Sequence, residues 1–192
     1  MLKSTTSPHR NDQPSPWVQR FAPLVPEGEV LDLACGIGRH SRLFAAGHRV
    51  LAVDRDSDAL ATIAAEGIAT LQADLENGGA WPFEKSRFAG IVITNYLHRP
   101  LFPFIFDSLA DDGILIVETF AVGNGQFGKP SNPDFLLAPG ELLALAGAYV
   151  NANLRIIAYE DGYVEKPQPA MIQRVCLAKT AFCENSRRFP LI

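Results

Sequence analysis

The stretch at residues 29–40, EVLDLACGIGRH, constrains the fold more than any other part of the sequence. Its first five residues are apolar for the most part and rich in branched side chains, which is typical of a buried parallel strand. Gly36 and Gly38 then form a turn in which the backbone can approach a ligand closely. Residues 41–46 can continue as a helix that ends at Gly47. A strand, a glycine turn and a helix in this order predict the start of a nucleotide-binding βαβ unit.

The same stretch favours one kind of nucleotide over another. A dinucleotide site would require Gly-x-Gly-x-x-Gly, whereas Ser41 stands at the last position of this pattern. An acid, Asp32, lies four residues before Gly36. A carboxylate there suits a ligand with a cationic ammonium group and would repel a pyrophosphate.

Apolar segments and turn signals continue the alternation of strands and helices along the chain. Further strands are expected at 49–54, 68–72, 88–94 and 114–120, and helices at 15–22, 56–66, 101–109 and 140–148. A turn is expected at Asp111-Asp112-Gly113. Two last strands, at 153–159 and 171–179, are joined by a connection that starts with Glu160-Asp161-Gly162 and suits antiparallel pairing. The sequence thus predicts an α/β, Rossmann-like doubly wound, mostly parallel seven-stranded sheet with one antiparallel strand near the C-terminus.

Length and composition limit the class of protein. The 192 residues are predicted to form one domain at 15–180, with a flexible arm at 1–14 and a tail at 181–192. The formal net charge of −4 gives no general attraction to nucleic acid or to an anionic membrane, and no stretch is long and apolar enough to span one. Three cysteines without paired spacing and four scattered histidines favour a cytoplasmic setting and no metal. We expect a monomer or a homodimer.

Polar residues follow three successive strands of the predicted sheet. Asp54 ends one strand, Asp74 follows the next, and Asn95 follows the one after that. A ligand of an open parallel sheet lies beyond the carboxyl ends of its strands, where a carboxylate can accept the two hydroxyls of a ribose. Any one of these residues alone could simply form a turn or cap a helix. Their occurrence together with Asp32 and the glycines indicates a cofactor site.

The pattern D-x-x-x-G-x-G that starts at Asp32 resembles the first motif of class I S-adenosylmethionine-dependent methyltransferases. The segments LDLACGIGRHS, GHRVLAVD and NPDFLLAPGEL are similar to the small bacterial branch related to the tellurite-resistance methyltransferases. The resemblance implies S-adenosylmethionine as the cofactor and a small molecule as the acceptor. It also implies a set of cofactor-binding residues: Asp32, Ala34, Gly36, Gly38, Asp54, Asp74, Leu75 and Asn95. In this family the acid at the position of Asp74 receives the adenine amino group.

Candidates for the transfer step follow the fourth strand. Methyl transfer requires alignment and exclusion of water, and an amine or hydroxyl acceptor also profits from a base. His98 can take a proton near neutral pH, Tyr96 can orient the acceptor, and Arg99 can hold an anion. Alternatively, His98 and Arg99 cap or pair with the following helix. Arg39 and His40 either contact the methionine carboxylate or cover the sheet edge. For His40 we prefer the position at the sheet edge.

The glycine- and proline-rich segment 121–139 is predicted to be a lid over the acceptor. Phe127 would close on the ligand and Lys129 would attract an anionic acceptor, unless the segment is only a solvated surface loop. Two other functions stay open. One is a non-catalytic sensor or partner-binding module that binds S-adenosylmethionine. The other is a nucleic-acid methyltransferase, against which the acidic balance counts.

Overall fold

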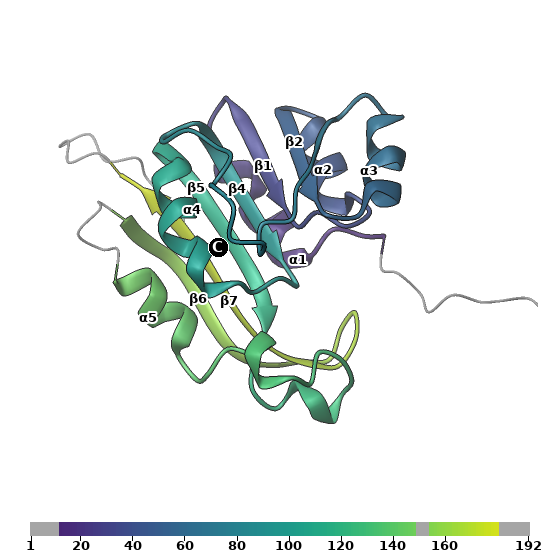
Figure 1. Ribbon diagram of the computed structural model, residues 1–192. Coiled ribbons are helices and arrows are strands. Elements are labelled where there is room, and N and C mark those ends of the chain that lie inside the picture. Colours follow the sequence, from purple (N-terminus) through teal and green to yellow (C-terminus); the bar gives the residue numbers. More distant parts are fainter. Residues whose placement is uncertain (1–11, 149–153, 181–192) are drawn as a thin grey trace, which may run out of the picture.

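The computed structural model describes residues 12–148 and 154–180 (Figure 1). Its strands are β1 (Glu29–Leu33), β2 (Arg49–Asp54), β3 (Ala69–Gln72), β4 (Phe88–Thr94), β5 (Leu109–Phe120), β6 (Leu154–Val164) and β7 (Ala170–Lys179). The helices are α1 (Pro16–Phe21), α2 (Arg39–Ala45), α3 (Ser57–Ala64), α4 (Phe102–Ser108) and α5 (Glu141–Gly147). Short 3-10 turns are η1 (Ala22–Leu24), η2 (Arg99–Leu101), η3 (Asn124–Gln126) and η4 (Pro133–Phe135).

The strands form one seven-stranded sheet in the order β3-β2-β1-β4-β5-β7-β6. The pairs from β3 to β5 are all parallel, and β7 runs antiparallel to both of its neighbours. This arrangement confirms the predicted α/β, mostly parallel sheet with one reversed strand near the C-terminus. Most of the predicted arm at 1–14 and the whole tail at 181–192 lie outside the described residues, and the division into an arm, one domain and a tail stays a prediction.

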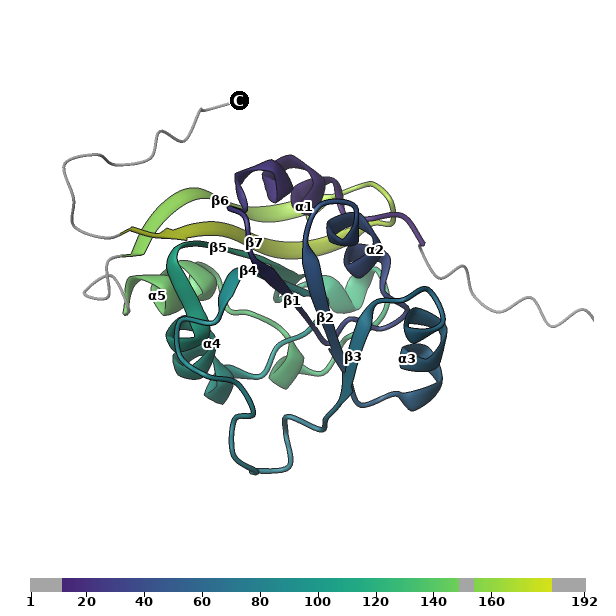
Figure 2. The ribbon, with the colours of Figure 1, turned by 90° about the horizontal axis from the view of Figure 1, so that it is seen from above.

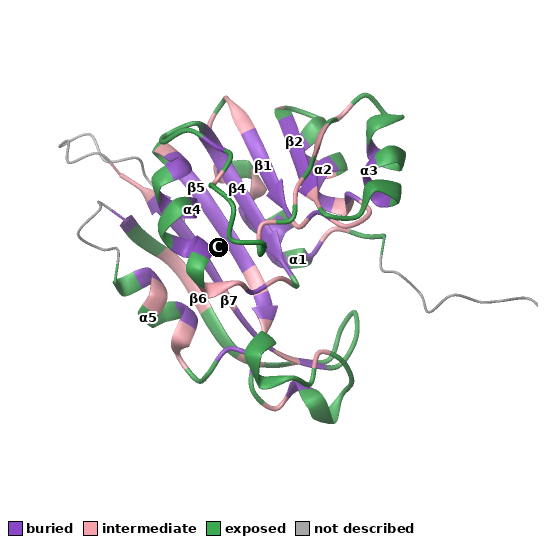
Figure 3. Ribbon diagram, in the orientation of Figure 1, coloured by how far each residue is buried: buried purple, intermediate pink, exposed green. Residues whose placement is uncertain are grey.

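Helices cover both faces of the sheet, as a doubly wound fold requires (Figure 2). Successive residues of a strand point to opposite faces, so Val30 packs with α1 and α2, and Leu31 packs with α4 on the other side. Figure 3 shows that the central strands are buried along their length. Trp17 and Phe21 of α1 are buried with their ring centroids 4.6 Å apart, so this helix packs on the body of the domain.

Two predicted turns lie inside strands. Residues 111–113 belong to β5, where Asp112 takes a φ of +63° and the pairing with β4 shifts register. Residues 160–162 belong to β6, where Glu160 lies opposite Arg174 of β7 and forms an ion pair with it. At 111–113 the pairing with β4 skips these residues, so they form an irregularity within β5. At 160–162 a long ladder with cross-strand pairs outweighs the local turn preference. The connection between β6 and β7 is therefore shorter than the sequence indicated.

Candidate functional site

Two cavities open beyond the carboxyl ends of the parallel strands. The first has a volume of about 520 Å³ and the second of about 440 Å³. Both are lined by Ala34, Asn95 and Phe120, which lie at the ends of β1, β4 and β5. The cavities are thus adjoining parts of one groove. Its position beside β1, whose two neighbours are β2 and β4, is the switch point at which open parallel sheets bind ligands.

The second cavity contains the acids that were predicted to bind a nucleoside. Asp54, Asp74 and Leu75 line it. The Asp54 carboxylate is held in place, because its Oδ2 accepts a 2.7 Å hydrogen bond from the Gly36 N–H and its Oδ1 accepts one of 3.0 Å from Asp56. Each carboxylate oxygen can accept a further hydrogen bond. The ends of β2 and β3 therefore bring two carboxylates to one wall of the groove.

The two glycines of the turn have different surroundings. Gly36 lines the first cavity with a φ of +54°, and a Cβ added there would meet nothing within 4 Å. Gly38, with a φ of +79°, precedes α2, and a Cβ there would lie 2.7 Å from Ile63 Cδ1 of α3. The backbone is therefore open to a ligand at Gly36. At Gly38 the expectation needs correction, because the space is taken by core packing between α2 and α3.

Asp32 does not reach the groove. Its side chain is 1% exposed, and its Oδ2 accepts a 2.6 Å hydrogen bond from the Ser41 hydroxyl of α2. Burial raises the pKa of Asp32 to about 6, and the hydrogen bonds from Ser41 oppose this rise. The predicted contact with an ammonium group is therefore corrected: Asp32 joins β1 to α2 within the core.

His40 is buried between three elements. Its Nε2 accepts a 3.1 Å hydrogen bond from the Ser15 N–H at the start of α1, and its Nδ1 lies 3.3 Å from the Thr94 hydroxyl at the end of β4. An acceptor at Nε2 places the proton of the neutral ring on Nδ1, which then donates to Thr94. Burial, with a contribution from the charge of Arg39, lowers the pKa of His40 to about 3. The neutral ring covers the sheet edge, while Arg39 lines the first cavity.

The candidates after β4 are distributed differently from the prediction. Tyr96 lines the second cavity, where burial and then the charge of Glu76 raise the pKa of its hydroxyl. His98 lies half-buried and lines neither cavity. Arg99 also lies outside both; it pairs with Glu141 of α5 (Nη2 to Oε2, 2.9 Å). Arg99 thus forms an ion pair with α5, whereas the alternative placed the pair on the following helix, α4, and its role as an anion ligand is corrected as well.

The predicted lid, segment 121–139, is anchored at both of its ends. Ala121 and Leu137 form a bridge, and the carbonyls of Asp134 and Leu136 accept hydrogen bonds from Arg99. Within it, the buried Asn124 bonds to the Pro130 carbonyl and to the N–H of Met171 in β7.

Asn124 and two further side chains of this loop line the first cavity. Phe127 and Lys129 line it, and the Phe127 ring lies 5.1 Å from that of Tyr163 in β6. The loop forms a structured wall whose outer part meets the β6–β7 hairpin.

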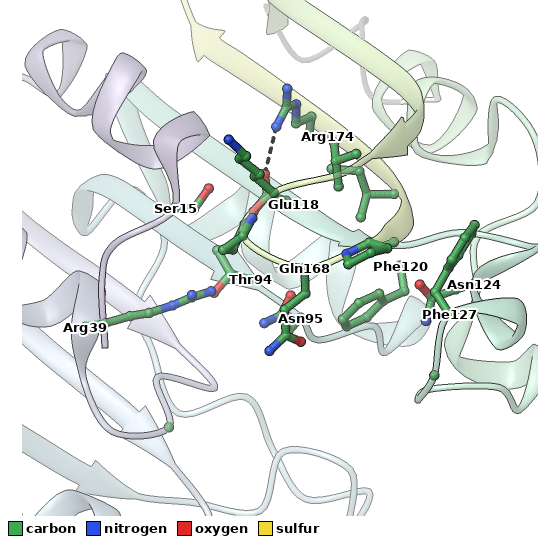
Figure 4. Close-up of a pocket in the computed structure, with 18 of the residues that line it drawn as sticks. Ser15, Arg39, Thr94, Asn95, Glu118, Phe120, Asn124, Phe127, Gln168 and Arg174 are labelled. Atoms are coloured by element: carbon green, nitrogen blue, oxygen red, sulfur yellow. Dashed lines mark hydrogen bonds and ion pairs between the residues drawn. The ribbon is translucent and has the colours of Figure 1, made fainter. Parts of the chain in front are cut away.

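Sequence reasoning missed the charged residues that β5 and β7 contribute to the first cavity. Glu118 and Arg174 line it and form an ion pair of 3.2 Å, which Figure 4 shows beside Thr94 and Asn95. Lys166, in the β6–β7 connection, also lines it. An acid directly after the apolar run 114–117, near the carboxyl end of a predicted strand, was the signal that would have identified Glu118.

Comparison with known proteins agrees with this geometry. Residues 30–110 match the family model described as a methyltransferase domain. An S-adenosylmethionine dependent methyltransferase from Mesorhizobium loti has a TM-score of 0.66 at 17% identity, covering 85% of this chain and 96% of that one. TehB from Haemophilus influenzae has a TM-score of 0.68 at 18% identity, covering 85% of this chain and 61% of that one. Among curated proteins no match is found.

At these identities the solved structures establish the fold, and the family match adds the methyltransferase domain. Together they confirm the predicted resemblance to class I S-adenosylmethionine-dependent methyltransferases. The chain therefore has a methyltransferase domain match at 30–110 and the fold of S-adenosylmethionine-dependent methyltransferases. No helix of the described residues has the length and apolarity that a membrane crossing requires.

Proposed function

We propose that this protein is an enzyme that transfers the methyl group of S-adenosylmethionine to a small-molecule acceptor bound in the groove. The observation that carries the proposal is the placement of Asp54, Gly36 and Asn95 around one groove at the switch point of the sheet. The cofactor's sulfonium supplies an already activated methyl group. The chain's own residues then have to bind, orient and exclude water.

The residues present fit this cofactor. Asp54 is held by two backbone N–H groups and can accept the two ribose hydroxyls, while Asp74 and Leu75 suit the adenine. The open position at Gly36 and the shared residue Asn95 leave room for the chain that leads from the ribose into the first cavity. We assign the nucleoside to the second cavity and the amino-acid end to the first. The cytoplasmic setting, the absence of a nucleic-acid partner and the monomer or homodimer state stay predictions.

Calorimetry with S-adenosylmethionine, S-adenosylhomocysteine and NAD tests the cofactor assignment, and a screen of thiol, oxyanion, amine and hydroxyl acceptors tests turnover. We expect binding of the first two ligands and not of NAD. Binding without turnover of any acceptor would favour the non-catalytic sensor instead. Tight binding of NAD alone would refute the proposal.

The outer part of the first cavity favours an acceptor with a negative charge. Phe120 and Phe127 offer apolar surface, and Lys129 and Lys166 approach from two separate loops. Neither lysine has an ion-pair partner among residues 12–148 and 154–180. Two unpaired cations at the mouth of a cavity attract anions and repel cations.

Replacing both lysines by alanine should therefore raise the KM of an anionic acceptor about tenfold, since an exposed charge pair contributes up to ~1 kcal/mol. The KM of a neutral acceptor and the Kd of S-adenosylhomocysteine should stay the same. Lys85→Ala is the matched control, because Lys85 is exposed and pairs with Asp107 outside both cavities. An equal rise in KM for neutral and anionic acceptors would contradict the assignment.

A further inference from the structure

One acidic and one basic side chain face the first cavity without pairing with each other. Glu118 comes from the end of β5 and Arg39 from the start of α2 (Figure 4). No ion pair joins the two within the described chain, although opposite charges at one cavity would pair if they were in reach. Gly36 and Ser15 line the same cavity.

The Glu118 carboxylate is held in place and keeps one oxygen for a ligand. Its side chain is 13% exposed, and its Oε2 accepts a 3.2 Å hydrogen bond from Nη1 of Arg174. Arg174 is shared, because its Nε donates to Glu160 at 2.9 Å and its guanidinium lies 4.7 Å from the Trp17 ring centroid. Oε1 of Glu118 has no hydrogen-bond partner among the described residues. Arg174 thus acts as a positioning residue for Glu118.

Arg39 is half-buried, and its guanidinium makes few hydrogen bonds within the described chain. Its one hydrogen bond there is a long contact of 3.4 Å from Nη1 to the carbonyl of Gln13. Burial lowers the pKa of its guanidinium, and the nearby negative charges of Glu118 and Asp32 oppose this effect. A partly desolvated guanidinium with unused donors at a cavity wall is a binding group for a carboxylate.

A ligand group that carries both charges would match this pair. The amino-acid end of S-adenosylmethionine has an α-ammonium and an α-carboxylate on one carbon. Asp32, the acid that the sequence offered for the ammonium, is buried in the core. The two unpaired lysines lie on the outer loops and carry the same sign as Arg39.

We propose that Glu118 binds the α-ammonium group of the cofactor and that Arg39 binds its α-carboxylate, an assignment that rests on the proposed function. Recognition of the amino-acid end then comes from β5 and from the first turn of α2. The glycine turn contributes open backbone, and Asp32 acts only within the core.

Calorimetry with three ligands tests this assignment. S-adenosylhomocysteine has both charged groups, its decarboxylated analogue keeps the amine alone, and 5′-methylthioadenosine has neither. Glu118→Gln should weaken binding of the first two by about ten- to a hundredfold and leave 5′-methylthioadenosine unchanged. Arg39→Gln should weaken binding of S-adenosylhomocysteine alone.

Two matched controls separate this effect from a general loss of charge. Glu160→Gln removes the other carboxylate that Arg174 binds, and Arg42→Gln removes an arginine one turn after Arg39 that pairs with Glu66. Neither Glu160 nor Arg42 lines the cavities. Both control variants should therefore bind all three ligands with the affinity of the wild type.

Unchanged binding of S-adenosylhomocysteine to folded Glu118→Gln and Arg39→Gln would overturn the assignment and leave the proposed function intact. An equal loss for all three ligands would also overturn it, because it would indicate a distorted site. Failure of the wild type to bind S-adenosylhomocysteine at all would overturn the proposed function, and the assignment with it.

Discussion

Replacement of Asp54 by alanine should weaken binding of S-adenosylhomocysteine by ~2–4 kcal/mol, which is roughly 30- to 1,000-fold in Kd. Two effects act together. The variant loses the charge-assisted hydrogen bonds to the ribose, and the N–H groups of Gly36 and Asp56 lose the carboxylate that they now bind. Isothermal titration calorimetry measures the change in Kd directly.

Two variants show which part of this loss comes from the carboxylate. Asp54→Asn keeps one acceptor oxygen and should lose less affinity than Asp54→Ala. Asp58→Ala removes an exposed acid in the first turn of α3, outside both cavities, and should bind as the wild type does. Wild-type affinity in a folded Asp54→Ala protein would refute the role of Asp54.

Lowering the pH should change the free energy of unfolding of His40→Gln and Asp32→Asn in opposite directions relative to the wild type. The pKa of His40 is about 3 in the folded protein, below its ordinary value of 6.5, so the unfolded chain binds an extra proton between these values. His40 therefore lowers the free energy of unfolding as the pH falls through 6.5. The pKa of Asp32 is about 6, above its ordinary 3.8, so the folded protein binds the extra proton. Asp32 therefore raises the free energy of unfolding as the pH falls through 6.

Between pH 7 and pH 4.5 each contribution is about 2 kcal/mol, so in the wild type they nearly cancel. Relative to the wild type, His40→Gln should gain stability over this range and Asp32→Asn should lose it, which separates the two variants by roughly 4 kcal/mol. Urea denaturation of all three proteins at both pH values measures this. Parallel pH profiles would show that neither buried group titrates as described.

The parts of the fold that the sequence predicts well are those with local signals. β2 and β4 have the predicted bounds, because continuous apolar runs end at a polar residue in each case. Asp54, Asp74 and Asn95 reach one groove because the carboxyl ends of parallel strands meet at one edge of the sheet. The position of these three residues could therefore be predicted without knowing how distant segments of the chain pack.

The errors concern residues whose surroundings come from elsewhere in the chain. Asp32 lies within a strand that is covered on both faces, so its partner depends on where α2 packs. Arg99 pairs with a glutamate 42 residues away on α5. Glu118 acquires its partner from β7, and the register of a reversed strand cannot be deduced from apolar alternation alone.

β7 is inserted between β5 and β6 in the sheet. Two different parts of the chain line the groove. The acids beside the second cavity belong to the segment 30–110, whereas the turn 165–169 and the loop 121–139 supply the outer wall of the first. The turn starts and ends at Val164 and Ala170, which lie opposite each other in the ladder. Its length and sequence can therefore vary while the sheet stays the same. A library randomised at 165–169 would change the wall of the first cavity and leave the residues that line the second unaltered.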